Sequence, residues 1–175
     1  MRKIVLPILG VAIPLIILGG AIGVSRVAAQ VAAGPVQPIF FQHSVHAGTL
    51  QIQCTFCHRN AEQGAAATVP AVEQCMFCHN VAGKALPEVQ KVLAAWADGD
   101  PQKQTPIDWI RVHRVPDHVK FAHEPHIRAG FECSTCHGAV ETMDQVRQVR
   151  PLNMSDCVTC HRQNDAPTDC VTCHN

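Results

Sequence analysis

The stretch Cys54-Thr55-Phe56-Cys57-His58 decides the fold of this chain, because it is the first of five copies of the unit Cys-x-x-Cys-His. The chain has ten cysteines, and the five units use all of them. Two thiols three residues apart can each bond to one vinyl group of a single haem, and the adjacent imidazole then lies beneath the iron as an axial ligand. The units predict five covalently bound c-type haems. The attachment residues are Cys54, Cys57, Cys75, Cys78, Cys133, Cys136, Cys157, Cys160, Cys170 and Cys173, and the motif ligands are His58, His79, His137, His161 and His174.

Zinc sites and disulfides are the competing interpretations of so many cysteines. A tetrahedral site of four cysteines needs two Cys-x-x-Cys pairs, so five pairs leave one unmatched. Neither zinc nor a disulfide scaffold explains why a histidine follows every second cysteine. The count and the spacing together favour haem.

The composition limits what kind of core the protein can form. The chain has 175 residues, a formal net charge of +0, no Tyr, 2 Trp and 6 Phe. The lack of a basic excess gives no reason to expect nucleic acid as a partner. About 140 residues remain beyond the N-terminal segment, roughly 28 for each haem, which is too little peptide for a conventional core. We therefore expect a mostly α-helical and irregular domain with few strands, in which the porphyrins form the core and whose fold is lost without haem.

The N-terminal segment predicts a membrane anchor over residues 1–26. From Ile4 to Val24 the chain carries no charge for 21 residues, which is long enough to span a bilayer as a helix. A cleaved signal peptide is the alternative, since small residues follow the apolar run, but the run is longer than a usual signal core. Arg2 and Lys3 place the N-terminus in the cytoplasm and the haem domain on the periplasmic side. Residues 27–38, which contain Gly34 and two prolines, are expected to form a linker.

Residues 39–175 form the predicted pentahaem domain, and its two halves begin with related segments. Phe41-x-His43-x-x-His46 precedes the unit at Cys54, and Phe-x-His-x-x-His recurs from Phe121, before the unit at Cys133. Histidines three residues apart share one face of a helical turn, so each segment can offer two imidazoles to two neighbouring haems. The predicted halves are residues 39–80 with two haems and 111–175 with three, joined by a connector of residues 81–110.

The connector contains one predicted helix. It runs from Pro87, a residue favoured in the first turn, to Ala97, and Asp98-Gly99-Asp100-Pro101 ends it. Val89, Val92, Leu93 and Trp96 fall on one face, which either packs on the haem cluster or docks a partner subunit.

The histidines outside the five units are candidates for the second axial position of each iron. Five haems need at most five such ligands, so the supply exceeds the demand and favours closed, six-coordinate iron that transfers electrons. A methionine could replace one histidine, and it would raise the potential of that haem. The candidate distal ligands are His43, His46, His113, His118, His123, His126 and Met154, the last lying three residues before Cys157.

The repeated Phe-x-His-x-x-His segments followed by Cys-x-x-Cys-His resemble the small multihaem cytochromes of the c3/c7 type. In that group the first histidine of the pair usually ligates the haem attached just after it. The resemblance therefore implies that His43 serves the haem of Cys54 and His123 the haem of Cys133. It leaves His46 and His126 for other haems of their own halves.

A closer resemblance rests on the Arg111–His126 stretch, Arg-Val-His-x-x-Pro-Asp-His-Val-x-Phe-x-His-x-x-His, and on Asn-Met-x-x-Cys before the fourth unit. With one N-terminal span and five haems, the chain is similar to the membrane-anchored pentahaem cytochrome subunit of bacterial alternative complex III. The resemblance implies a single-pass subunit of a respiratory or photosynthetic complex in the bacterial cell membrane, with its haem domain in the periplasm. That complex oxidises menaquinol and passes electrons to a periplasmic acceptor. The implied partners are the lipid bilayer and iron–sulfur, quinol-binding membrane and monohaem cytochrome subunits.

Two other functions remain open at this point. One is a single-span quinol dehydrogenase cytochrome that feeds a periplasmic reductase; those cytochromes typically carry four haems. The other is a multihaem reductase, an enzyme that needs one iron with an open position. All five units here end in histidine, which favours an electron-transfer subunit that is not an enzyme by itself.

Overall fold

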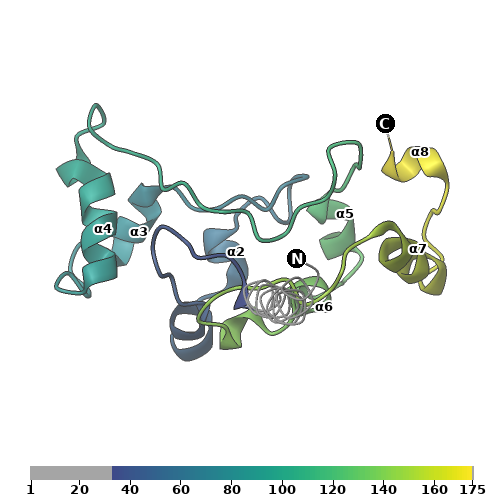
Figure 1. Ribbon diagram of the computed structural model, residues 1–175, viewed down its shortest axis with the longest axis horizontal. Helices are drawn as coiled ribbons and strands as arrows, with labels where there is room; N and C mark the ends of the chain where they lie inside the picture. The colour runs from purple at the N-terminus through teal and green to yellow at the C-terminus, as the bar shows by residue number, and fades with distance from the viewer. Residues whose placement is uncertain (1–32, 175) are drawn as a thin grey trace, which may run out of the picture.

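Short helical elements separated by long irregular segments make up the described part of the chain, which is residues 33–174 in this computed structural model (Figure 1). The described residues form no β-strand, only an isolated antiparallel bridge between Val119 and His174. This agrees with the predicted mostly helical and irregular class. The elements are η1 (Ser44–Thr49), α2 (Cys54–Cys57), α3 (Val72–His79), α4 (Pro87–Trp96), η2 (Ala97–Gly99), α5 (His123–Arg128), α6 (Cys133–His137), η3 (Val140–Thr142), α7 (Met154–Gln163) and α8 (Cys170–Cys173).

The predicted membrane anchor, residues 1–26, lies outside the described residues, as do residues 27–32 of the predicted linker. Within residues 33–174 no helix combines the length and the apolar character needed to cross a bilayer. The end of the predicted linker is hydrogen-bonded to the domain. The Gln37 side chain pairs with both backbone groups of Ile110 at 2.8 Å, and the Gln145 amide donates to the carbonyl of Gly34 at 2.8 Å.

Every Cys-x-x-Cys-His unit lies on a helical turn, on α2, α3, α6, α7 and α8. Residues three apart share a face of such a turn, so the two thiols of each unit point to the same side. Two of the turns begin with a side-chain cap: the Asn153 side chain accepts from the amide of Asp156 at 3.0 Å, and Asp169 accepts from the amide of Thr172 at 3.1 Å.

The connector helix α4 confirms the helix predicted from Pro87, and it ends one residue earlier than expected. Ala97 adopts a left-handed conformation with φ of 50°, which stops the helix. Val92 is buried with Ile39 and Met76, so the apolar face of α4 packs against α3 and the start of the domain. Of the two roles weighed for this face, packing within the chain is the one observed.

The peptide forms only a small hydrophobic core. The buried hydrophobic residues within the described part are Ile39, Ala61, Met76, Val89, Val92, Ala95 and Met143, and no side chain there is completely buried. Large apolar side chains are exposed instead, such as Leu50 at 60% and Phe77 at 59%. An apolar surface of this extent in so small a domain is expected when a bound group supplies the missing core.

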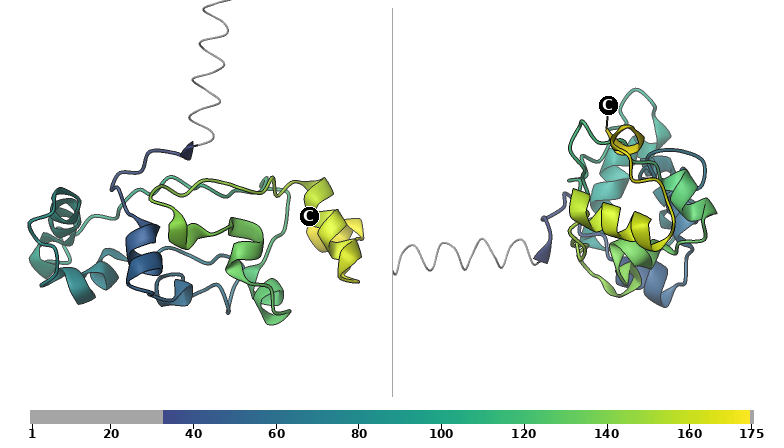
Figure 2. Two further views of the ribbon diagram at one scale, coloured as in Figure 1. Left: turned by 90° about the horizontal axis from the view of Figure 1, so that it is seen from below. Right: turned by 90° about the vertical axis from the view of Figure 1, so that its right-hand side faces the viewer.

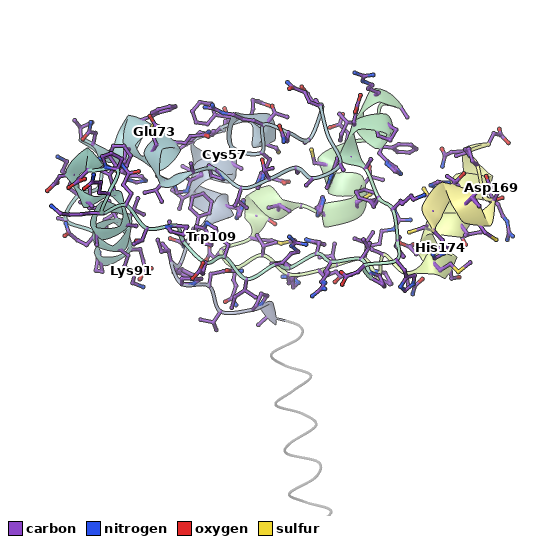
Figure 3. The ribbon with its side chains drawn as sticks, turned by 90° about the horizontal axis from the view of Figure 1, so that it is seen from above. Cys57, Glu73, Lys91, Trp109, Asp169 and His174 are labelled. Atoms are coloured by element: carbon purple, nitrogen blue, oxygen red, sulfur yellow. The ribbon has the colours of Figure 1, made fainter. Side chains whose placement is uncertain are left out.

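The motif helices follow one another along the longest axis of the molecule, in an order that differs from their order in the sequence. Helix α3 lies at one end beside α4, α2 and α6 occupy the middle, and α7 and α8 lie at the other end (Figures 1 and 2). Side chains mark the two ends in the view from above: Glu73 and Lys91 lie at one, and Asp169 and His174 at the other (Figure 3).

Backbone hydrogen bonds join the two predicted halves. The amide of His123 donates to the carbonyl of Ala65 at 3.1 Å, and the amide of Ser44 donates to the carbonyl of Met143 at 3.0 Å. Each histidine-pair segment is therefore held by a segment from the other half of the chain.

Candidate haem sites

In the first half the structure brings each motif histidine together with a histidine from η1 or its N-cap. The rings of His46 and His79 have centroids 6.2 Å apart. His43 lies close to His58: the pKa of His43 is lowered to about 4, mainly by burial and to a lesser extent by the nearby His58 and His46. The unit at Cys75 thus has an opposing imidazole, and the unit at Cys54 has His43 nearby.

The second half repeats this arrangement. His126 and His161 have ring centroids 6.0 Å apart. His123 lies 6.3 Å from His137 with nearly parallel rings, inclined by 11°. As in the first half, the first histidine of the pair faces the unit that directly follows it, and the second faces the next unit along the chain.

The last unit is opposed by His118, and a backbone contact places that residue there. The antiparallel bridge joins Val119 to His174, and the amide of Lys120 donates to the carbonyl of Cys173 at 2.7 Å. The rings of His118 and His174 are consequently stacked, with centroids 5.5 Å apart and an angle of 14°.

These separations fit two imidazoles that share one iron. Metal–imidazole bonds are about 2 Å long, so two axial ligands have their nitrogens about 4 Å apart and their ring centres about 6 Å apart. Moreover, no three His, Cys, Asp or Glu side chains within residues 33–174 converge on a point that would hold a bare metal ion. Opposed pairs of donors are what a metal needs when a porphyrin already occupies its equatorial plane.

Backbone carbonyls fix the tautomer of six histidines. A carbonyl oxygen can only accept, so the Nδ1 atom bonded to it must carry the proton, which leaves Nε2 free to bind a metal. The six donors and acceptors, with Nδ1···O distances, are His46 to Gln42 at 2.9 Å, His58 to Thr68 at 2.6 Å, His79 to Ala82 at 2.9 Å, His123 to Ala65 at 2.7 Å, His126 to Ala122 at 2.7 Å and His161 to Pro167 at 2.6 Å.

The phenylalanine of each repeat holds both histidines of its pair. Phe41 meets the ring of His43 edge-on at 4.9 Å and stacks on His46 at 4.2 Å. Phe121 meets His123 edge-on at 4.9 Å, and it lies 4.9 Å from the ring of His126. The spacing shared by the two repeats thus includes an aromatic side chain that orients two candidate ligands, a role that sequence reasoning did not assign.

Two candidate ligands are placed differently from the rest. The ring of His113 meets His137 edge-on at 4.3 Å, which is too close for two imidazoles on opposite sides of one iron, and its buried Nε2 has no hydrogen-bond partner. Burial lowers the pKa of His113. Met154 begins α7 with its side chain 67% exposed, and the structure does not bring it to a motif histidine. Both therefore remain predictions as iron ligands.

None of the ten cysteines is paired in a disulfide, and the cysteines of adjacent units are neighbours. Burial raises the pKa of the Cys57, Cys133, Cys136 and Cys157 thiols, and nearby thiols contribute a further upward shift. The neighbours identified in this way are Cys57 with Cys78, Cys133 with Cys54, Cys136 with Cys160, and Cys157 with Cys173. The five units therefore form a continuous row, in the order second, first, third, fourth, fifth.

Arg150 joins the third and fourth units, and sequence reasoning missed it because nothing in its local sequence indicates a partner. Its Nε donates to Asp156 on α7 at 2.8 Å, and its guanidinium donates to the carbonyl of Thr135 on α6 at 3.2 Å. The hydrogen bond with the Asp156 carboxylate is the main cause that raises the pKa of Arg150.

Paired cysteines followed by a histidine, with a second histidine across from it, are the arrangement that covalently bound haem requires. Comparison with known families agrees: residues 119–175 match the family described as cytochrome c7 and related cytochrome c. The matched stretch is the C-terminal third of the chain, and it contains the third, fourth and fifth Cys-x-x-Cys-His units.

The chain is also related to a protein of Nitratidesulfovibrio vulgaris described as "Menaquinone reductase, multiheme cytochrome c subunit". The two are 31% identical over 101 residues, which is 58% of this chain and 45% of the relative. The chain thus matches less than half of the length of that relative.

Proposed function

We propose that the chain holds five haem c groups in one row and transfers electrons along it. The observation that carries this proposal is that four of the five motif histidines have another histidine at a ring separation suited to one shared iron. The fifth, His58, lies near enough to His43 to influence its pKa. The proposed ligand pairs are His43 with His58, His46 with His79, His123 with His137, His126 with His161, and His118 with His174.

A haem at each site supplies an iron that gains or loses one electron, and the chain's own residues set the conditions for that exchange. The ten cysteines hold the groups covalently. The carbonyls that accept from Nδ1 keep Nε2 unprotonated and directed toward the metal. Histidines on both sides leave no axial position for a substrate, so the chain by itself is proposed not to be an enzyme.

Two measurements on the full-length protein test this proposal. Pyridine haemochrome analysis should give five haems per chain, and a clearly lower number would contradict the proposal. Carbon monoxide added to the reduced protein should leave the spectrum unchanged, because all five irons are six-coordinate. A spectral change at one haem would instead support the multihaem reductase.

We further propose that the chain is the membrane-anchored cytochrome subunit of a complex that exchanges electrons with menaquinone. The support is the apolar stretch from Ile4 to Val24, the resemblance to the alternative complex III subunit, and the menaquinone chemistry in the name of the bacterial relative. Iron–sulfur, quinol-binding and monohaem cytochrome subunits are its proposed partners, and the periplasmic side of the bacterial membrane is its proposed location. In a carbonate wash of membranes, the full chain should stay with the membrane and a chain lacking residues 1–32 should be released.

The direction of electron flow separates two candidate functions. Alternative complex III oxidises menaquinol, whereas the relative is named for menaquinone reduction. Potentiometric titration against the menaquinone couple distinguishes them, because electrons pass toward the higher potential. Haems mostly above that couple would support menaquinol oxidation, which we favour from the Arg111–His126 stretch, and haems mostly below it would support the reductase.

A further inference from the structure

The anchoring of the ligand histidines divides four of the proposed haem sites into two kinds. In the second and fourth units both imidazoles donate Nδ1–H to a carbonyl, since His46 and His79, and likewise His126 and His161, all form this bond. In the first and third units only one imidazole of each pair does so.

The imidazoles without this bond are His43 and His137. The Nδ1 atom of His43 is buried and has no hydrogen-bond partner. The ring of His137 is half-buried and forms no hydrogen bond within the described part of the chain. Both are packed instead against rings, His43 against the edge of Phe41 and His137 against the edge of His113.

The absence of a partner for His43 has a structural cause. In the second half the carbonyl of Ala65 accepts from both the amide and the Nδ1 of His123. In the first half the crossing segment offers the carbonyl of Met143 to the amide of Ser44, one residue beyond His43. This shift of one residue leaves His43 with no acceptor.

The difference changes how strongly each pair stabilises ferric iron. An imidazole whose Nδ1–H donates to a carbonyl is a more basic ligand, and it favours the more positively charged ferric state. An imidazole without that bond, in surroundings of low polarity, favours the ferrous state and raises the potential. The fifth site is outside this comparison, because neither His118 nor His174 donates from its ring to a carbonyl within residues 33–174 and His118 is exposed, where water can accept the hydrogen bond.

The two weakly anchored sites are neighbours in the middle of the row. His58 is among the groups that influence His137, and the Cys54 and Cys133 thiols lie together. The strongly anchored second and fourth sites flank them on either side (Figure 1).

From the proposed ligand pairs we infer that the central haems, attached at Cys54/Cys57 and Cys133/Cys136, have higher potentials than the two haems that flank them. The central pair is then a two-electron store: each of its irons takes one electron and passes from ferric to ferrous, and no bond is formed or broken. Two electrons are what one menaquinol releases, so the store matches the proposed donor. This inference rests on the proposed function.

Substitution of the distal ligands tests the order of the potentials. In the full-length holo-protein, His43→Met and His123→Met should each raise the potential of one haem. In the wild-type titration, the waves of these two haems should lie at higher potential than those of the two flanking haems. His46→Met and His126→Met are matched controls from the same repeats, and they should displace lower waves. If either control displaces a wave at or above those of the central pair, the inference is overturned. If none of the four variants displaces a wave, the ligand pairs and the inference both fail.

A measurement on the wild-type protein tests the same inference even if the variants fail to fold. Histidine ring resonances labelled with ¹⁵N can be followed by NMR as electrons are added stepwise. The rings of His58 and His137 should become diamagnetic before those of His79 and His161. The reverse order would overturn the inference even with all five haems present.

Discussion

At the scale of the residue, the imidazole ring is the functional unit of this protein, and the atom that distinguishes one ring from another is Nδ1. Six rings bond this atom to a carbonyl, whereas His43 buries it without a partner. The motif and pair histidines could be singled out from sequence because their spacing suits haem ligation, and as iron ligands they remain predictions. The carbonyls were not predictable, because any residue can supply one.

Arg150 offers a test of a single side chain. Its pair with Asp156 is mostly shielded, with exposed fractions of 28% and 21%, and it also bonds to α6. Arg150→Ala should lower the free energy of unfolding by about 1–2 kcal/mol, because a shielded charge-assisted hydrogen bond is lost. Denaturation by urea measures the change.

Arg114→Ala is the control for that substitution. Arg114 pairs with Asp117 in an exposed setting, at 65% and 87%, so its loss should cost less than about 0.5 kcal/mol. Equal effects of the two substitutions would contradict the role given to Arg150.

At the scale of the element, the two Phe-x-His-x-x-His segments have different backbones and the same function. The second forms helix α5, as predicted, but the first is a π-helical turn, η1, with His43 as its N-cap. Sequence could not reveal this, because the pattern of histidines is the same in both segments, whereas η1 also packs on η3.

Phe121→Leu tests the aromatic residue of the second segment. We expect the EPR signals of two low-spin haems to broaden, because His123 and His126 lose the ring that fixes their orientation. Phe40→Leu is a control, since that side chain is exposed and lies outside the repeat pattern. Unchanged signals in Phe121→Leu would show that the histidines are oriented by other contacts.

Helix α4 was predicted almost to the residue, because proline at its start and the Asp-Gly-Asp-Pro sequence after it are strong local signals. Val92→Asp should destabilise the protein by roughly 3 kcal/mol, since it places a charge in the small core with Ile39 and Met76. Lys91→Ala, which removes an exposed pair with Glu88 and a hydrogen bond to the carbonyl of Pro38, should destabilise the protein much less. Thermal unfolding of both variants checks the contrast.

At the scale of the whole molecule, the peptide encloses too little apolar surface to be stable alone. We expect the chain produced without haem attachment to show weak helical circular dichroism and no cooperative thermal transition. The holo-protein, measured in parallel, should show both. A cooperative transition in the apo-chain would contradict the idea that the bound groups form the core.

The sequence identifies the five Cys-x-x-Cys-His units of the row, but it does not predict their order in space. The short link between His161 and Cys170 indicated that the last two units are close, and they are. The spacing of 21 residues between Cys54 and Cys75 allowed the second unit to lie on either side of the first. Long-range contacts, such as His123 with Ala65, decide that the first unit adjoins the third.

The packing of α4 on α3 also limits how such a protein can be enlarged. A sixth Cys-x-x-Cys-His unit added after α8 would lengthen the row of units, because no helix of the described chain covers that end (Figure 1). One inserted between Asn80 and Pro87 would have to displace α4 and the residues buried beneath it. We therefore expect engineered or naturally expanded versions to carry their additional units after α8.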